Sequence, residues 1–356
     1  MPTIWCAISG HGFGHAAQVV PVLNELRRHV PHLSALLRTT VPDSFFKDRL
    51  TLPWSLQAVQ QDIGCVQKGP LEIDVLGTWN AYHSFHATWE SRVEAETAAM
   101  RGVGPSLILA DTPYLAVSAG RRAGIPAAVL GNFTWGDILP CLNDSGEPDP
   151  LLQSILAAYG EADIGLRIAP GLPLSGVRKV VDVGVIAEPG QSQRDNLRSR
   201  LGIPASERLV LVGFGGIPLE TYPWDQMEAM QGFRFLVDGI PPRGSSRIYS
   251  LATLPFPFKT ALASVDVVVT KPGYGTILEA LALGLPVVYV RRYNFADEAP
   301  LVEFLHAHGQ GVELSRQDFL AGQWKPALEA VGGRRPTGLR ISGAAESAET
   351  LMQYFQ

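Results

Sequence analysis

The sequence predicts an α/β protein made of two doubly wound, Rossmann-like domains that face one another. Three observations indicate this: the chain has 356 residues, short apolar runs alternate with helical patterns along most of it, and three glycine-rich turns each follow an apolar run. The length exceeds one ordinary core and suits two domains of about 150–200 residues each. Helical connections make such sheets parallel, and parallel sheets bind ligands at the carboxyl ends of their strands.

The N-terminal half repeats the order of strand, turn and helix. An apolar run at 3–9 ends in a glycine turn, a helical pattern covers 16–28, and the next predicted strand is 32–39. The pattern then predicts a further helix at 114–123 and strands at 106–110, 125–130, 164–168 and 180–183. A strand, a glycine loop, a helix and a strand in this order begin a Rossmann-type unit.

The stretch 187–206 is rich in Gly, Pro, Ser and Gln and is predicted to link the domains. The alternation then begins again, with a helix predicted at 277–283 and strands at 209–213, 233–238, 265–270 and 286–290. An amphipathic helix is expected near 344–355. We therefore expect a first domain over 1–188, a second over 189–340, and a C-terminal helix over 341–356 that docks back on them.

Composition and charge exclude several classes of partner. The formal net charge is -5, which provides no electrostatic attraction to nucleic acid. Three cysteines without paired spacing predict neither a disulfide framework nor a zinc site, and they favour a reducing compartment. The N-terminus does not read as a signal peptide, and no apolar run is long enough to span a bilayer. We therefore expect a cytoplasmic protein without a transmembrane segment.

The first glycine turn runs from Ser9 to His15 and contains His11, Gly12 and Gly14. Its glycines permit positive φ angles and let a ligand approach the backbone. The helix that follows would direct its free N-terminal amides at the same place, which favours anionic or sugar oxygens. The spacing is not that of a dinucleotide fingerprint. The alternative is a tight turn in which both histidines serve only as hydrogen-bonding partners.

A second glycine turn, at 213–218, follows the strand predicted at 209–213. Gly215 and Gly216 could offer their backbone amides to a phosphate group. Glycine turns also follow strands in the absence of any ligand, so this turn by itself is equally consistent with a structural role.

The third turn is the most specific motif in the chain. A predicted buried strand ends before Lys271, and the turn into the next helix contains Gly273, Tyr274, Gly275 and Thr276. Free amides at such a helix start suit a diphosphate. Glu279 lies one helical turn beyond Thr276, so its carboxylate can face the same opening and accept hydrogen bonds from two ribose hydroxyls. The alternative is a plain crossover with Glu279 on a solvated face.

Charged side chains follow the strand predicted at 286–290. Asp297 and Glu298 could accept hydrogen bonds from sugar hydroxyls, and Arg291 and Arg292 could approach a phosphate. The alternative is a solvated loop in which the two carboxylates stabilise a helix start.

Two further strand ends carry polar or aromatic residues. Asp111 could be functional, although an Asp before Thr-Pro can equally begin a helix. Asn132 and Trp135 follow another predicted strand, and Trp135 could either stack on a sugar ring or pack in the core.

These segments together resemble the GT-B family of glycosyltransferases, in particular the glycosyltransferase-like N-terminal domain of plant L-arabinokinases. A more distant likeness is to the N-acetylglucosaminyltransferase that completes lipid II in peptidoglycan synthesis. The shared segments span most of the chain in order: 9–15, 111–113, 132–135, 214–218, 271–283 and 291–300. The resemblance implies two facing domains with a cleft between them, and transfer of a sugar from a nucleotide-sugar, expected to be a UDP-sugar, to an unknown acceptor hydroxyl.

The resemblance also implies roles for single residues. The C-terminal domain would hold the donor: Glu279 on the ribose, Phe256 within 255–258 near the base, Asp297 and Glu298 on the sugar, and Gly273, Gly275 and Thr276 on the diphosphate with Gly215 and Gly216 nearby. The family often has Gln near Asp297, so the donor sugar stays open. The N-terminal domain would bind the acceptor, with His11 or His15 nearest the transferred carbon.

The expected reaction is an inverting, metal-independent displacement. The sequence has no Asp-x-Asp motif to hold a divalent cation on the diphosphate, and no cofactor is expected. Helix starts and arginines would stabilise the leaving diphosphate. His15 is the preferred general base, with His11 and Asp111 as alternatives. Two other functions stay open: a nucleotide-sugar hydrolase or epimerase on the same fold, and a protein that binds nucleotide-sugar without turnover.

Overall fold

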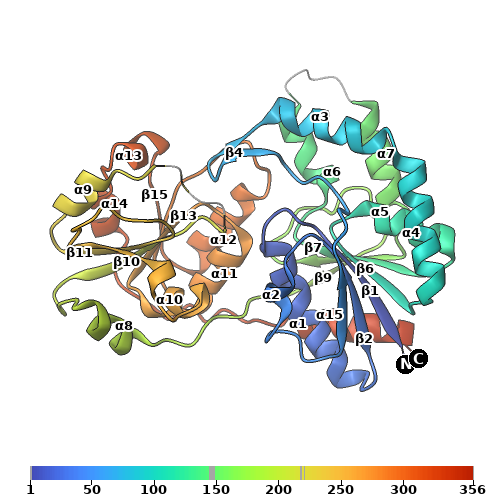
Figure 1. Cartoon of the computed structure of the whole chain (residues 1–356), viewed down its shortest axis with the longest axis horizontal. Helices are drawn as coiled ribbons and strands as arrows, with labels where there is room; N and C mark the ends of the chain where they lie inside the picture. Colours follow the sequence, from blue (N-terminus) through green and yellow to red (C-terminus); the bar gives the residue numbers. More distant parts are fainter. Residues whose placement is uncertain (1, 144–148, 217–218, 220, 356) are drawn as a thin grey trace.

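The chain forms two parallel sheets, each flanked by helices, that stand side by side (Figure 1). The computed structural model describes residues 2–143, 149–216, 219 and 221–355. The strand order is β3-β2-β1-β6-β7-β8-β9 in the first sheet and β12-β11-β10-β13-β14-β15 in the second. Neighbouring strands run parallel throughout the described part of both sheets. The predicted α/β class with two doubly wound sheets is confirmed.

The N-terminal half contains the first sheet, whose central strands are buried on both faces as helix-covered parallel strands must be. Its strands are β1 (Thr3–Ile8), β2 (Ser34–Arg38), β3 (Trp54–Gln57), β6 (Leu107–Asp111), β7 (Ala127–Gly131), β8 (Ile164–Ile168) and β9 (Val180–Val183). Its helices are α1 (Gly14–His29), α2 (Asp43–Phe46), α3 (Val75–His86), α4 (Trp89–Val103), α5 (Tyr114–Ala123), α6 (Trp135–Ile138) and α7 (Pro150–Tyr159). A small antiparallel hairpin, β4 (Gln67–Gly69) with β5 (Glu72–Ile73), extends from this half.

The C-terminal half contains the second sheet. Its strands are β10 (Arg208–Val212), β11 (Phe233–Val237), β12 (Ile248–Ser250), β13 (Val267–Thr270), β14 (Val287–Tyr289) and β15 (Gly311–Glu313). Its helices are α8 (Arg194–Leu201), α9 (Trp224–Ala229), α10 (Phe258–Ser264), α11 (Tyr274–Ala282), α12 (Glu298–His308), α13 (Arg316–Leu320) and α14 (Lys325–Ala330). The helix predicted at 277–283 thus starts earlier, because the chain is already helical after the N-cap Gly273.

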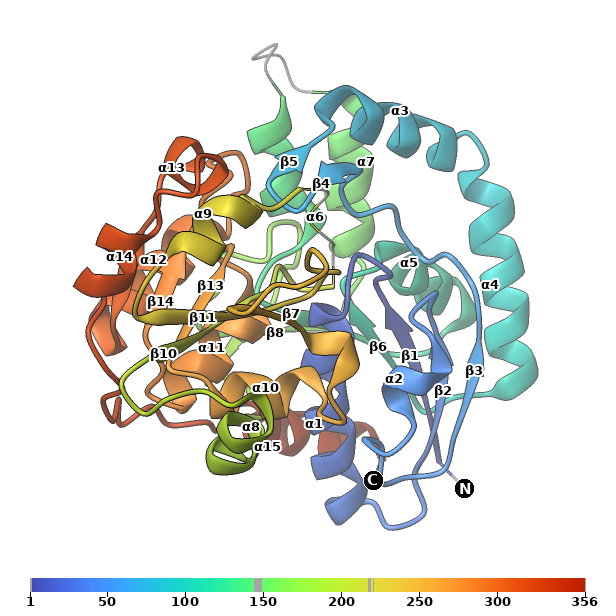
Figure 2. The same cartoon turned by 60° about the vertical axis from the view of Figure 1, so that its left-hand side comes forward.

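The C-terminal helix α15 (Gly343–Leu351) returns to the N-terminal half and lies beside α1 (Figure 2). Ala348 and Leu351 are buried in the same cluster as Val19 and Leu23 of α1. Burial of apolar surface contributes about 25 cal/mol of stabilising free energy per Å², which explains why this short amphipathic helix docks on α1. The predicted helix over 344–355 therefore packs on the domains, and its last residues, Met352–Phe355, form a 3-10 turn. The domain boundaries at 188 and 340 stay predictions.

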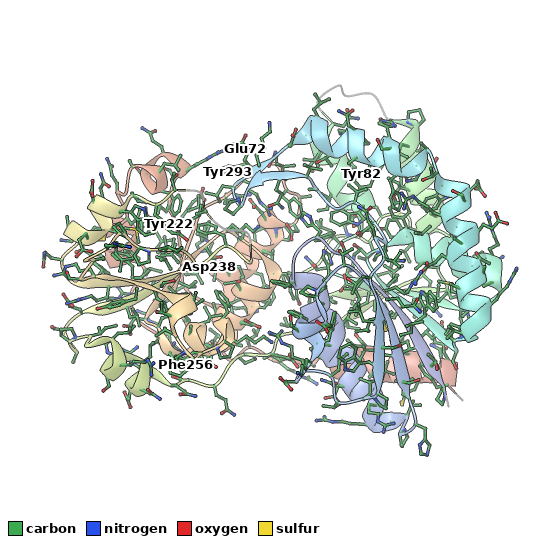
Figure 3. The ribbon with its side chains drawn as sticks, in the orientation of Figure 1. Glu72, Tyr82, Tyr222, Asp238, Phe256 and Tyr293 are labelled. Atoms are coloured by element: carbon green, nitrogen blue, oxygen red, sulfur yellow. The ribbon has the colours of Figure 1, made fainter. Side chains whose placement is uncertain are left out.

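Each half buries one apolar side chain in the hydrophobic cluster of the other half. Leu71, at the tip of the β4–β5 hairpin, is buried in the hydrophobic cluster of the C-terminal half. Phe295, in the loop between β14 and α12, is buried in the cluster of the N-terminal half. Glu72, on the hairpin (Figure 3), forms an ion pair of 2.7 Å with Arg316 of α13. These contacts hold the two halves together on one side.

Candidate active site

A cavity of about 420 Å³ lies where the carboxyl ends of the two sheets approach each other. Both halves contribute to its wall, and most of the predicted site residues line it. The predicted residues on the wall are His11, Gly12, Gly14, His15, Asn132, Gly215, Gly216, Lys271, Gly273, Tyr274, Gly275, Thr276, Glu279 and Asp297. Segments that are far apart in the sequence therefore meet at one site. Ile217 and Pro218 of the second glycine turn lie outside the described residues.

His15 stands in the first turn of α1 and is nearly buried. Its Nδ1 lies 2.7 Å from Oδ1 of Asp111, at the end of β6. A carboxylate accepts hydrogen bonds, so Nδ1 carries the proton and Nε2 is left as an acceptor. Burial alone would lower the pKa of His15, but the charge and hydrogen bond of Asp111, with Asp62 and Asp297, raise it. Burial raises the pKa of Asp111 to about 6, against the opposing effect of His15.

His11 has a different environment from His15. Its Nδ1 accepts a hydrogen bond of 3.2 Å from the backbone N–H of Cys65, and its Nε2 lies 3.2 Å from the amide of Gln67. Burial, followed by the charge of His15, lowers the pKa of His11 to about 3. The ring is therefore neutral across the physiological range and is a poor proton acceptor. Gly12 between the two histidines has a φ of 83°, which a residue with a side chain rarely adopts.

Glu279 faces the cavity from α11, as its helical spacing predicts. Nζ of Lys259, on α10, lies 3.3 Å from Oε1 of Glu279. Burial raises the pKa of Glu279, while the charges of Lys259 and of Arg49, from the N-terminal half, oppose that rise. A carboxylate with cations beside it and a free edge on the cavity is suited to a vicinal pair of hydroxyls.

Lys271 is placed just before the start of α11 and lines the cavity. Among the described residues, none forms a hydrogen bond or an ion pair with its ammonium group. Burial, followed by repulsion from Arg292, lowers the pKa of Lys271 to about 7, and Glu298 and Asp297 oppose this shift. An unpaired, buried amine next to a helix start is suited to an anion, which restores its positive charge.

A chain of amide and carboxyl groups crosses between the halves. Nε2 of Gln18, on α1, donates to Oδ1 of Asn132 at 3.0 Å, and Nδ2 of Asn132 lies 3.5 Å from Oδ2 of Asp297. Oε1 of Gln18 and Oδ1 of Asp297 are buried without a hydrogen-bond partner among the described residues. Burial raises the pKa of Asp297 to about 7. Buried acceptors without partners on a cavity wall indicate where ligand hydroxyls would bind.

Glu298 and Arg291 do not line the cavity. The Glu298 carboxylate is fully buried and accepts hydrogen bonds from Nε of Arg292 at 2.6 Å and from the backbone N–H groups of Arg292 and Tyr293. The guanidinium of Arg291 lies over the ring of Tyr293. Both charged residues therefore shape the loop after β14, and Arg292 is the arginine that reaches the cavity.

Trp135 and Phe256 also lie outside the cavity wall. The indole of Trp135 is fully buried, and its Nε1 donates to Oδ2 of Asp62 at 2.8 Å. Phe256 is found near α10 at the edge of the C-terminal half (Figure 3), and Phe258 faces the cavity instead. The aromatic residue at the cavity is thus two positions after the predicted Phe256. Pro257 is the N-cap of α10, and Phe258 is the first residue of that helix.

Phe13, Phe45 and Arg49 of the N-terminal half form one part of the cavity wall, which we call the aromatic ledge. The rings of Phe13 and Phe45 stack at 5.4 Å, and the guanidinium of Arg49 lies 4.0 Å above Phe45. The ledge touches the second glycine turn, since a Cβ added to Gly216, whose φ is 82°, would come within 3.1 Å of the Phe13 ring. Only glycine fits this position.

Sequence reasoning missed four polar residues at or near this site: Gln18, Arg49, Asp62 and Lys259. The helical spacing of Gln18, three residues after His15, could have revealed it, because residues at i and i+3 share a face. Asp62 and Lys259 carry no local signal, because their partners lie far away in the sequence. The charge interaction of Arg49 with Glu279 likewise joins distant segments. The described residues include no group of three or more His, Cys, Asp or Glu placed to hold a metal ion. Among them, no helix has the length and apolar character needed to cross a bilayer.

Comparison by sequence finds two relatives among curated proteins. No protein-family model matches the chain. An L-arabinokinase of Arabidopsis thaliana is 29% identical over 343 residues, which are 92% of this chain and 32% of that protein. The chain thus spans about a third of this relative's length. A UDP-N-acetylglucosamine–N-acetylmuramyl-(pentapeptide) pyrophosphoryl-undecaprenol N-acetylglucosamine transferase of Thermus thermophilus is 24% identical over 68% of this chain and 74% of its own length.

Comparison by structure finds similar two-domain proteins. The glycotransferase of kitacinnamycin superposes with a TM-score of 0.67 at 14% identity, covering 99% of both chains. The calicheamicin glycosyltransferase CalG4 gives 0.62 at 16% identity over 99% of this chain and 98% of its own. Medicago truncatula UGT71G1, solved with UDP-glucose, gives 0.62 at 12% identity over 99% and 93%. These likenesses confirm the fold that the sequence resemblance implied.

Proposed function

From the GT-B fold of this chain, we propose that it is a glycosyltransferase that moves a sugar from a nucleotide-diphosphate-sugar to an acceptor hydroxyl. The observation that carries this proposal is one cavity with two kinds of group on its wall. On one side is His15, which the fully buried Asp111 holds from behind, and on the other are Lys271 and Glu279 at the start of α11. The first group can accept a proton, and the second can hold an anion and a ribose.

The nucleotide would bind to the C-terminal half. Glu279 accepts hydrogen bonds from the ribose hydroxyls, and Lys259 favours the ionised form of its carboxylate against the burial that raises its pKa. The diphosphate contacts Lys271 and the amides at 273–276. The relative from Thermus thermophilus is named for UDP-N-acetylglucosamine, and UGT71G1 was solved with UDP-glucose, so a UDP-sugar is the donor that we propose first. Asp297 and Gln18 then face the donor sugar, each with a buried oxygen that has no partner among the described residues.

The reaction that we propose is a direct displacement with inversion and without a metal ion. Nε2 of His15 accepts the proton of the acceptor hydroxyl, while the acceptor oxygen forms a bond to the anomeric carbon. The bond from that carbon to the diphosphate oxygen breaks, and the diphosphate leaves with the electron pair. Asp111 holds Nδ1–H of His15 and stabilises the imidazolium, and Lys271 stabilises the leaving diphosphate. We favour His15 over His11 because His11 Nδ1 already accepts a backbone hydrogen bond.

Nucleotide binding tests the donor half of this proposal. Uridine diphosphate should raise the melting temperature, and Glu279→Gln should weaken its binding about tenfold, because ribose hydroxyls lose a charged acceptor worth about 1–3 kcal/mol. Glu329→Gln is the matched control, because Glu329 is 60% exposed on α14 and lies outside the cavity. The proposal fails if no nucleoside diphosphate alters the melting curve.

Turnover tests the acceptor half. Release of nucleoside diphosphate from nucleotide-sugars is measured against a panel of hydroxyl acceptors, with product stereochemistry read by NMR. His15→Ala should lower the rate by about 10²–10⁴-fold while leaving uridine diphosphate binding unchanged. Free sugar formed without acceptor would identify a hydrolase instead, and binding without turnover in the unsubstituted chain would identify a binding protein.

A further inference from the structure

A second buried carboxylate, Asp62, lies behind the pair formed by His15 and Asp111. It is 4% exposed and belongs to the segment between β3 and β4. Its Oδ1 accepts a hydrogen bond of 3.0 Å from Oγ of Ser9, and its Oδ2 accepts one of 2.8 Å from Nε1 of Trp135. Each carboxylate oxygen thus has its own donor, and an indole N–H can only donate. This arrangement favours the ionised form of Asp62, against the burial that raises its pKa.

The two partners of Asp62 are the residues that frame the histidine turn. The backbone N–H of Ser9 donates to the carbonyl oxygen of Asp111 at 2.7 Å, and Oγ of Ser9 accepts from the N–H of His11 at 3.2 Å. The ring of Trp135 lies 6.1 Å from that of His15. Asp62 therefore fixes both sides of the turn that presents His15, although it does not line the cavity itself.

Charges face His15 from several elements. The carboxylates are Asp111 at the end of β6, Asp62 behind the turn, and Asp297 at the N-cap of α12, and all three raise the pKa of His15. His11, from the same turn, is neutral, since its pKa is about 3. Lys271 and Arg292 line the same cavity from the C-terminal half, and both lower the pKa of His11. An imidazolium at His15 is therefore balanced by more than its direct partner.

We propose, on the basis of the function above, that Asp62 is a positioning residue that holds the histidine turn through Ser9 and Trp135 and supplies the second negative charge facing the His15 imidazolium. The proton taken from the acceptor hydroxyl stays on Nε2 of His15, and Asp62 takes up no proton. A base whose protonated form is stabilised is a stronger base, so the second carboxylate increases the rate of proton removal. The direct Asp111 contact orients the ring, and Asp62 adds charge without a contact to the ring.

The variant Asp62→Asn removes the charge and keeps the shape. The amide oxygen still accepts from Nε1 of Trp135, and the amide N–H₂ can donate to Oγ of Ser9. Histidine C2–H titration by NMR should show a lower pKa for His15 in this variant than in the parent chain. In turnover assays the acid limb of the pH–rate profile should move to lower pH, and the plateau rate should fall about three- to tenfold. A residue with a purely structural role would lower the rate without moving the limb.

Glu96→Gln is the matched control, because Glu96 is another buried carboxylate of the N-terminal half but is bonded to Arg38 and Gln61. It should leave the His15 titration unchanged. Ser9→Ala, which removes one donor to Asp62, should lower the His15 pKa by a smaller amount and serves if Asp62→Asn does not fold. An unchanged His15 titration in these variants would overturn the proposal. Since the titration needs no turnover, this outcome is distinguishable from a failure of the proposed glycosyl transfer.

Discussion

Replacement of Asp297 by Asn should stabilise the fold at alkaline pH, because this carboxyl group is buried and its ionised form destabilises the folded chain. Its pKa is about 7 in the folded chain against an ordinary value of 3.8, mainly because of burial. One pKa unit corresponds to about 1.36 kcal/mol, so ionised Asp297 destabilises the fold by about 4 kcal/mol if the carboxylate is dry. Water in the adjoining cavity reduces this to about 2–4 kcal/mol.

The sign follows from the raised pKa. Protonated Asp297 stabilises the folded chain fully below about pH 4, and this contribution is lost as the pH rises through 7. We therefore expect Asp297→Asn to raise the free energy of unfolding by about 2–4 kcal/mol at pH 8 and by about 1 kcal/mol at pH 4.5. Asn can keep the contact with Asn132 through its oxygen, which takes the place of Oδ2.

Urea unfolding at the two pH values measures this difference. The control is Asp225→Asn, because Asp225 is exposed in the first turn of α9 and its replacement should change stability by less than about 1 kcal/mol at either pH. An Asp297→Asn chain that is no more stable than the parent at pH 8 would refute the reasoning. Compared with the parent chain, the same variant should bind nucleotide-sugar more weakly and should bind nucleoside diphosphate equally well, since Asp297 would face only the sugar.

The remaining predictions concern Lys271 and Leu71. Burial lowers the pKa of Lys271 to about 7, so the amine must take up a proton when it binds an anion. The affinity for a UDP-sugar, measured by isothermal titration, should therefore fall about tenfold between pH 7 and pH 8.5, and Lys271→Met should abolish that dependence. Equal pH dependence in both chains would contradict this role. Leu71→Ala removes the hairpin anchor from the C-terminal cluster and should increase the radius of gyration measured by X-ray scattering without ligand, whereas Leu76→Ala, at a 71% exposed position on α3, should not. An unchanged scattering curve for Leu71→Ala would show that the hairpin does not hold the halves together.

The local sequence determined the elements and the turns between them. Alternation of apolar runs with helical patterns predicted parallel strands such as β1, β10 and β13, because a strand covered on both faces must be apolar throughout. Glycines after those strands predicted the turns, because positive φ and close ligand approach both require them. The helical spacing from Thr276 to Glu279 predicted the direction of that carboxylate, which the cavity wall agrees with.

Only the tertiary structure decided which charged side chains line the cavity and which form hydrogen bonds or ion pairs elsewhere. Glu298 and Asp297 are adjacent in sequence, yet the first is fully paired with Arg292 and the second has a buried oxygen without a partner. Asp62 joins the histidine turn, and Lys259 joins Glu279, through contacts between distant segments. The protonation behaviour of a group depends on burial and on neighbouring charges in space, and neither is encoded by residues nearby in the chain. The sequence therefore fixes the scaffold and the kinds of group at its strand ends, while the packing of two domains selects the groups that can act together.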